Sequence, residues 1–177
     1  MKQYLKPVVV MLSIILVCGG LLAVLSDLLF VTQEERIDRA IQKIYSGENV
    51  KLEQTIDIDL VDMSEFSDTG VIKACYLLDN GDYLVLSTGK KGYSNGTVTT
   101  YVAIDKDLTV KNVVEDSYTA QTLMAKLSSL YQNFIGKTAT QSQEQVKEIV
   151  TGATYSANAA SNSVYVALQF VSRVIGG

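Results

Sequence analysis

The 177-residue chain contains no histidine. Without an imidazole it cannot form a Ser-His-Asp or Cys-His nucleophile, a histidine-ligated zinc site or a histidine-ligated haem. Its two cysteines are Cys18, inside a long apolar run, and Cys75, inside a strand-like pattern. These two thiols cannot meet in a disulfide, and they are too few for an iron–sulfur cluster or a four-cysteine zinc site. We therefore expect no metal site, and a hydrolase is poorly supported because no paired carboxylates stand out.

The sequence also lacks a basic patch. Its net charge is −4, and the lysines and arginines do not cluster. A nucleic-acid-binding domain needs a basic patch or stripe, so we expect no nucleic-acid partner. Roughly 145 residues follow the apolar run, which is enough for one domain with its own core.

The apolar run, Val8–Ser26, contains no charged residue. As a helix it would span roughly 28 Å, close to the ~30 Å hydrocarbon core of a bilayer. Lys2 and Lys6 precede it and the next basic residue is Arg36, so the positive-inside tendency predicts a cytoplasmic N-terminus. We predict a single-pass cell-membrane protein with an extracytoplasmic main domain. A cleavable signal peptide is the alternative, but its apolar region is usually shorter, whereas this one continues almost to Val31.

The predicted fold is α+β: an antiparallel sheet meander with flanking helices, preceded by one transmembrane helix. The predicted parts are a cytoplasmic tip and anchor over 1–31, a stalk helix over 32–50 and an extracytoplasmic domain over 51–177. Thr32 can cap the stalk helix, which the apolar spacing places at about Gln33–Tyr45, and Gly47 ends it. Residues 51–60 alternate too weakly to distinguish strand from loop.

The clearest strand patterns lie in the middle of the chain. Val71–Leu78 and Tyr83–Ser87 are separated by Asp79-Asn80-Gly81-Asp82, and the Asn-Gly pair predicts a hairpin turn with positive φ at both turn positions. Two further strands, Val98–Ile104 and Leu108–Val114, are joined by a turn at Asp105–Asp107. Together these segments predict a meander of about four strands.

Helical patterns return towards the C-terminus. Thr119 can cap a helix over Ala120–Phe134, Gln143–Val150 fits a short helix, and Ser156–Val174 fits a long one. A loop of small and hydroxyl-bearing residues leads into the long helix.

This loop carries the most informative chemistry in the sequence. Gly152 and Ala153 leave room for a ligand to approach the backbone, and the N–H groups and dipole of the helix start attract an anion. Thr151, Thr154 and Ser156 contribute three hydroxyls, which suits a phosphate-bearing ligand. Hydroxyl residues before a helix are also common simply as caps, so the residues by themselves leave both interpretations open.

The run Thr151-Gly152-Ala153-Thr154-Tyr155-Ser156 resembles the flavinylation motif of FMN-binding domains, Ser/Thr-Gly-Ala-Thr-x-Ser/Thr. Glu148 stands where the family usually has an aspartate. The similar families are the G subunit of the Rnf ion-translocating oxidoreductase and the C subunit of the sodium-pumping NADH:quinone reductase. Gly92-Tyr93 with the strand–turn–strand that follows, and Phe134-Ile135-Gly136-Lys137, also fit the family's layout. The resemblance implies that a flavin transferase links FMN through its phosphate to Thr154, within an FMN-binding domain over 51–177.

The resemblance also implies a set of cofactor-binding residues and a role. Besides Thr154 these residues are Thr151, Gly152, Ala153, Ser156, Thr119 and Leu123. The family's Glu-Thr-Pro-Gly-Leu-Gly loop near the flavin is replaced here by Thr119–Met124, in which only Leu123 is retained. The implied role is a redox subunit, not a self-contained catalyst, that relays electrons in an Rnf-type translocase beside other membrane redox subunits. A stand-alone extracytoplasmic FMN electron carrier and a non-redox anchored interaction module are the alternatives.

Overall fold

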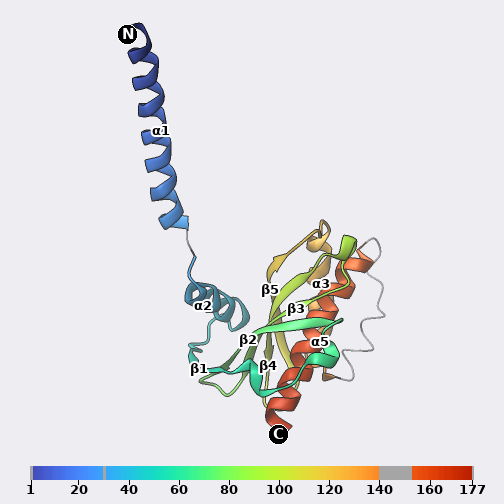
Figure 1. Cartoon of the computed structure of the whole chain (residues 1–177). Helices are drawn as coiled ribbons and strands as arrows, with labels where there is room; N and C mark the ends of the chain where they lie inside the picture. The colour runs from blue at the N-terminus through green and yellow to red at the C-terminus, as the bar shows by residue number, and fades with distance from the viewer. Residues whose placement is uncertain (1, 30, 140–152, 177) are drawn as a thin grey trace. The chain divides into compact units, whose positions relative to one another are not determined.

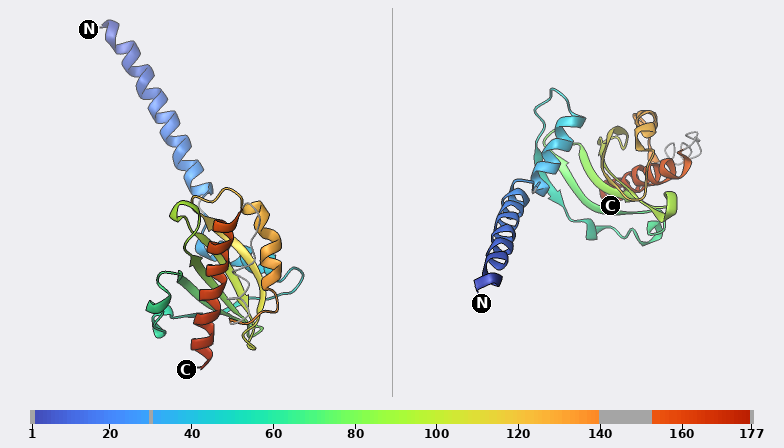
Figure 2. Two further views of the ribbon diagram at one scale, coloured as in Figure 1. Left: turned by 90° about the vertical axis from the view of Figure 1, so that its right-hand side faces the viewer. Right: turned by 90° about the horizontal axis from the view of Figure 1, so that it is seen from above.

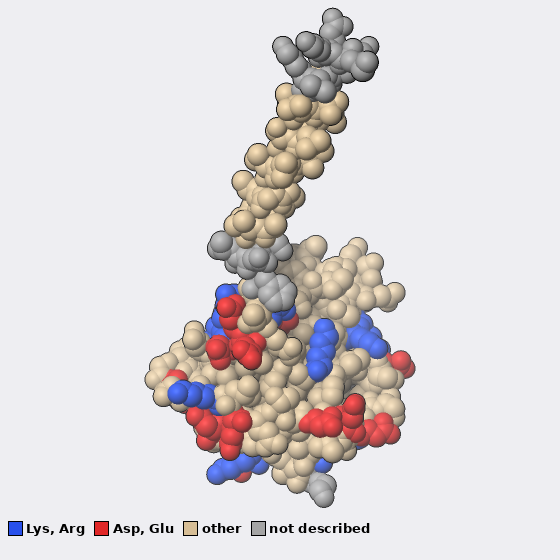
Figure 3. All heavy atoms as spheres, turned by 60° about the vertical axis from the view of Figure 1, so that its left-hand side comes forward, with Lys and Arg blue, Asp and Glu red and all other residues tan. Residues whose placement is uncertain are grey.

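The computed structural model describes residues 2–29, 31–139 and 153–176, and the chain divides into two compact units, Met1–Ile37 and Asp38–Gly177. In the first unit, helix α1 (Lys2–Leu29) contains the apolar stretch Pro7–Leu25, with a mean hydropathy of 3.0 and 0% burial (Figure 1). Figure 3 shows this stretch as a rod without charged side chains. By length and composition, α1 can cross a membrane once, as the sequence predicts.

The second unit is built on a five-stranded antiparallel sheet in which each strand lies beside its neighbour in sequence (Figures 1 and 2). The strands are β1 (Leu52–Ile56), β2 (Gly70–Leu78), β3 (Tyr83–Gly89), β4 (Val98–Ile104) and β5 (Val110–Tyr118). Short 3₁₀ helices η1 (Ile58–Leu60) and η2 (Ser64–Phe66) separate β1 from β2, and η3 (Tyr93–Asn95) separates β3 from β4. The α+β meander predicted from the sequence is therefore confirmed.

Apart from β2 beginning at Gly70 and β3 ending at Gly89, the strand predictions differ from the structure in three details. The weakly alternating segment supplies a fifth strand, β1, and the last strand begins at Val110 and extends to Tyr118. The prediction of positive φ at both turn positions of the β2–β3 hairpin is wrong. Only Gly81 takes a positive φ, of 84°, because the connection is a wider loop in which Leu78 N–H donates to Asp82 C=O at 2.9 Å.

Both faces of the sheet centre are covered, since all seven residues of β4 are buried. Helix α5 (Thr154–Gly176) crosses one face and packs on β2, β3 and β4 (Figure 2). On the opposite face, Ala40 and Ile41 of α2 (Gln33–Ile44) are buried, and the hydroxyl of Tyr45 donates to Asp82 at 2.7 Å. The main apolar core lies between the sheet and α5.

The helix predicted over Ala120–Phe134 is shorter in the structure. A 3₁₀ helix, η4 (Met124–Leu127), leads into α3 (Ser128–Phe134). Thr119 does not cap a helix, because its N–H donates to Thr97 C=O at 2.9 Å and extends the pairing of β4 and β5. Ala120 follows with φ 58°, outside the helical region. The predicted helix over Gln143–Val150 lies outside the described residues.

Candidate functional site

Helix α5 begins at Thr154 and lies unusually close to the sheet. The backbone carbonyl of Ala159 and the amide of Ser163 occupy the space that a Cβ at Gly89, the last residue of β3, would need. Ala160 on the same helix is fully buried. Small residues therefore let the helix backbone rest directly on the end of β3.

Buried hydroxyls fix the register of α5 along the sheet. Ser163 Oγ lies 2.6 Å from Thr100 Oγ1 and donates to Ser87 C=O at 3.0 Å, while Ser87 Oγ donates to Ser163 C=O at 2.9 Å. Asn162 Nδ2 donates to Lys90 C=O at 2.9 Å, just after β3. Because hydrogen bonds are directional, this set determines which α5 residues face the segment that follows β3.

Gln121 joins three segments that meet at the start of α5. Its side chain is 4% exposed, and its Oε1 accepts from Tyr93 N–H at 3.2 Å and from Ser156 Oγ at 2.5 Å. Its Nε2 donates to Tyr93 C=O at 3.3 Å and to Thr119 C=O at 3.0 Å. A side-chain amide has two donor hydrogens and two acceptor positions, so all four are used. Gln121 thus sets the relative position of the η3 turn, the end of β5 and the first turn of α5.

The η3 turn is shaped to pack against this amide. A Cβ at Gly92 or Gly96 would collide with the Gln121 side chain, so both positions require glycine for lack of space. Between them Ser94 takes φ 51°, a left-handed conformation that few side chains adopt without cost. The turn holds the backbone of Tyr93 against Gln121 and leaves the Tyr93 ring outside.

A cavity of about 280 Å³ opens between the η3 turn and the start of α5. Its described lining residues are Tyr93, Thr122, Leu123, Ala153, Thr154, Tyr155 and Ser156, none of them charged. The rings of Tyr93 and Tyr155 contact each other edge to face, with centroids 6.5 Å apart and planes at 63°. The cavity is therefore lined by both aromatic rings and hydroxyl-bearing side chains.

The hydroxyls in the cavity differ in accessibility. Ser156 is 5% exposed and its Oγ already donates to Gln121. Thr122 and Thr154 are exposed, but only Thr154 stands at the start of a 23-residue helix. The first N–H groups of such a helix have no partners within it, and its dipole favours negative charge there. The arrangement can accept a phosphate at Thr154 and an uncharged, planar group against the tyrosines.

The structure brings together some of the residues that the sequence predicts. Ala153, Thr154, Ser156 and Leu123 line the cavity. Thr119 is not among its described lining residues, and its carbonyl instead accepts from Gln121. The remaining predicted residues, Thr151 and Gly152, lie outside the described residues, as does Glu148. The cofactor-binding roles of all seven stay predictions.

Sequence reasoning missed Gln121 and the pairing of Tyr93 with Tyr155. Gln121 occupied a position in a predicted helix, where one polar residue carries no signal. Tyr155 stands at the variable position of the loop motif, and Tyr93 follows a glycine in a predicted turn. Only the three-dimensional arrangement brings these two aromatic rings into contact.

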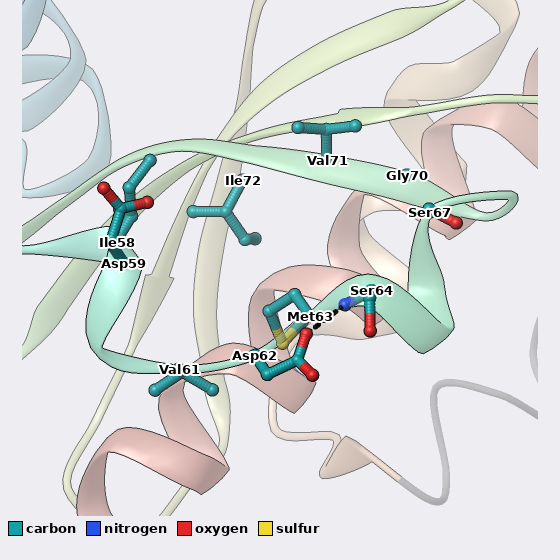
Figure 4. Close-up of a pocket in the computed structure, with 10 residues that line it drawn as sticks. All are labelled: Ile58, Asp59, Val61, Asp62, Met63, Ser64, Ser67, Gly70, Val71 and Ile72. Atoms are coloured by element: carbon teal, nitrogen blue, oxygen red, sulfur yellow. Dashed lines mark hydrogen bonds between the residues drawn. The ribbon is translucent and has the colours of Figure 1, made fainter.

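A second, larger hollow of about 490 Å³ lies between η1, η2 and the start of β2 (Figure 4). Asp59 and Asp62 stand on it, and Ser64 N–H donates to the Asp62 carboxylate at 2.9 Å. This backbone N–H and the Ser64 hydroxyl lower the pKa of Asp62, with Arg173 adding to the effect and desolvation opposing it. The hollow therefore carries negative charge at neutral pH.

No curated protein and no solved structure matches the chain. Residues 92–169 match the family model described as FMN-binding domain. This range includes the η3 turn, β4, β5, Gln121 and most of α5, and every described residue that lines the 280 Å³ cavity. Residues 92–169, somewhat less than half of the chain, are therefore similar to FMN-binding domains.

Proposed function

We propose that the protein is a membrane-anchored flavoprotein that carries FMN as a phosphoester on Thr154 and relays electrons. The observation that supports this most strongly is the position of Thr154. It is an exposed hydroxyl at the start of a 23-residue helix, on the rim of an aromatic cavity, within the segment that matches an FMN-binding domain.

The residues around Thr154 fit FMN in chemistry. The α5 start offers N–H groups and a positive dipole end to a phosphate. The cavity beside it has no charged residue in its described lining, which includes Leu123 and the two tyrosines, and this suits the planar flavin ring. FMN supplies one- or two-electron transfer when bound, so the protein's part is to hold and orient it.

Attachment requires an activated flavin donor, for which FAD is the natural choice. Thr154 Oγ1 forms a bond to the phosphorus of the FMN moiety, the phosphoanhydride bond of FAD breaks, and AMP leaves with the hydroxyl proton. The chain gains the mass of FMN minus water. The exposure of Thr154 would let a separate flavin transferase reach it, whereas Ser156 is buried and bonded to Gln121.

The proposed setting is the extracytoplasmic side of the cell membrane, with α1 as an uncleaved anchor and the N-terminus in the cytoplasm. Lys2 and Lys6 before the apolar stretch support this orientation. A covalent link would be useful on that side of the membrane, because a flavin released from the protein would be lost from the compartment. An anchored chain should stay with membranes through an alkaline carbonate wash, and its release into the supernatant would refute the anchor.

We propose that the protein works as a subunit of an Rnf-type ion-translocating complex, in contact with other membrane redox subunits. The departure of Thr119–Met124 from the family's loop favours a second candidate, a stand-alone extracytoplasmic FMN electron carrier. Affinity purification from native membranes separates the two. Co-purification of integral membrane redox proteins supports the complex, and a chain that purifies alone in mild detergent supports the carrier.

The test of covalent attachment is flavin fluorescence after denaturation. The full chain, co-expressed with a flavin transferase, is denatured, washed and run on a gel. The parent chain and Thr122→Ala should fluoresce, because Thr122 is an exposed hydroxyl of the same cavity without the helix start. Thr154→Ala should not fluoresce. A fluorescent Thr154→Ala band would show that the proposed attachment site is wrong.

A further inference from the structure

Two tyrosines at the cavity are largely exposed to solvent. Tyr93 is 60% exposed and Tyr155 is 62% exposed, although the two rings contact each other. An aromatic side chain gains considerable free energy when its surface is removed from water. Leu123, 39% exposed, lies on the same cavity and adds apolar surface. Together the three residues form an accessible apolar face that a flat ligand can cover.

This face is held in place by backbone contacts. Tyr93 is held through its own N–H and C=O, which bond both ends of the Gln121 amide. Tyr155 is the second residue of α5, whose register Ser163 fixes further along the helix. Because these contacts do not involve the rings, both rings remain available to a ligand. Because the backbone is already ordered, only the side-chain torsions have to be fixed when a ligand binds, which lowers the entropy cost of binding.

The size and charge of the cavity indicate which part of FMN it takes. Its volume of about 280 Å³ is at the lower limit of small-molecule sites. It therefore suits one portion of a nucleotide better than the whole. No charge lines it among the described residues, which favours the ring system over the phosphate. Thr154 and Tyr155 are adjacent in sequence, so a phosphate on the first leaves the ring within reach of the second.

We propose that Tyr93 and Tyr155, with Leu123 beside them, form the subsite that holds the isoalloxazine ring of FMN. This inference rests on the proposed function, but it concerns a different part of the ligand from the bond at Thr154. A partner protein that places an apolar side chain on the same face is the competing occupant.

The proposal has a spectroscopic consequence. A phenol in contact with a photoexcited flavin donates an electron to it and takes the electron back, so the excited state decays without light and without net reaction. A leucine side chain cannot do this. The bound flavin should therefore be strongly quenched, and the quenching should depend on Tyr93 and Tyr155.

The experiment has two arms that use the full chain in detergent micelles. In the first, chains loaded by a flavin transferase are compared by emission per bound flavin for the parent, Tyr93→Leu, Tyr155→Leu and Tyr118→Leu. Tyr118 is the matched control, since it is 53% exposed but is not among the residues that line the cavity. Emission should rise severalfold in the first two variants and stay at the parent level in the control.

In the second arm, FMN is titrated into Thr154→Ala chains, where no ester can form at that position. Replacing either cavity tyrosine by leucine should raise the Kd for FMN about fivefold. This factor corresponds to the free energy that an aromatic pair contributes beyond the burial of its surface. Tyr118→Leu should leave the Kd unchanged. Intact mass, recorded on the first-arm samples, reports the ester independently.

The outcomes separate the two proposals. A parent chain without the FMN mass that still binds and quenches added FMN through Tyr93 and Tyr155 would refute the ester and support the ring subsite. A loaded chain whose leucine variants emit like the parent would refute the ring subsite and leave the ester intact. FMN that neither loads nor binds would overturn both, and the face would then belong to a protein partner.

Discussion

The cavity at the start of α5 and the hollow between η1, η2 and β2 differ in both size and charge, and the difference in charge matters more for binding a phosphate. The hollow is the larger, about 490 Å³ against 280 Å³, but Asp59 and Asp62 stand on it. The smaller cavity has aromatic and hydroxyl residues and a helix start beside it. A phosphate would be repelled by the first and attracted by the second. The charge of the two regions, and not their volume, is therefore the reason for placing the proposed flavin site at the smaller cavity.

The two regions are also held together by different kinds of contact. At the cavity, the buried Gln121 amide joins three segments with four hydrogen bonds. At the hollow, Arg173 Nη1 donates to Asp62 C=O at 2.7 Å, pairs with Glu65 and lies 4.9 Å from the ring centroid of Phe66. The Arg173 and Glu65 side chains are 37% and 58% exposed, so water screens their pairing. The cavity should thus respond strongly to mutation and the hollow weakly.

The largest effect is expected at Gly89. In Gly89→Val the new side chain would meet the carbonyl of Ala159 and the amide of Ser163, and a helix backbone cannot move aside cheaply. We expect a loss of at least about 3 kcal/mol in unfolding free energy, together with impaired flavin loading. Urea unfolding of the full chain in micelles measures the first quantity. A variant as stable as the parent would show that α5 does not rest on β3 as described.

Gln121→Leu should have the next largest effect, because it leaves the part-buried Tyr93 N–H and the buried Ser156 hydroxyl without their acceptor. We expect a loss of about 2–3 kcal/mol and reduced covalent flavin per chain. Gln132→Leu, at an exposed position of α3, is the matched control and should change stability by less than about 0.5 kcal/mol. If the two variants were equally stable, the proposal that Gln121 positions the η3 turn against α5 would be wrong.

Arg173→Gln tests the hollow between η1, η2 and β2. It should lower the free energy of unfolding by less than about 1 kcal/mol, as is usual when an exposed ion pair is removed. Flavin loading should equal that of the parent, because Arg173 contacts Asp62, Glu65 and Phe66 and is not among the described residues that line the cavity. Thermal unfolding and flavin absorbance per chain are the measurements. A loss of flavin in this variant would contradict the claim that flavin loading depends on the cavity and not on the hollow.

The smallest effect is expected for Asp62→Asn. The pKa of Asp62 is lowered in the folded state, so its carboxylate stabilises the fold above the unfolded-state pKa near 3.9. This contribution is lost as pH falls through the lowered folded-state pKa. Asp62→Asn should therefore melt slightly below the parent at pH 7, and the two melting temperatures should converge at the acid end. A constant difference at all pH values would contradict this.

Local patterns predict much of this fold. The bounds of β4 follow from its run of strand-forming residues and the turn after it, and α5 follows from a long apolar periodicity. The helix prediction failed at Thr119 and Ala120. A threonine before an apolar stripe is the usual local pattern of a helix start, so nothing in the local sequence indicates that Thr119 pairs with a distant segment. The pairing of Thr119 with Thr97, which overrides it, depends on residues distant in sequence.

The candidate site divides in the same way. Thr154 and Ser156 are found from sequence because their spacing and the helix that follows are local features. Gln121, Tyr93 and Tyr155 are not, because their roles come from contacts between the η3 turn and α5. A sequence motif can therefore suggest the proposed phosphate position, whereas the residues proposed to surround the ring are recognised only in the fold.

The most direct test of the central claim is the intact mass of the mature chain purified from its own host, with fragmentation to locate any added group. We expect an excess equal to FMN minus water, carried by the peptide that contains Thr154. A mass equal to that of the amino acids alone, or the same excess on Thr122, would contradict the account.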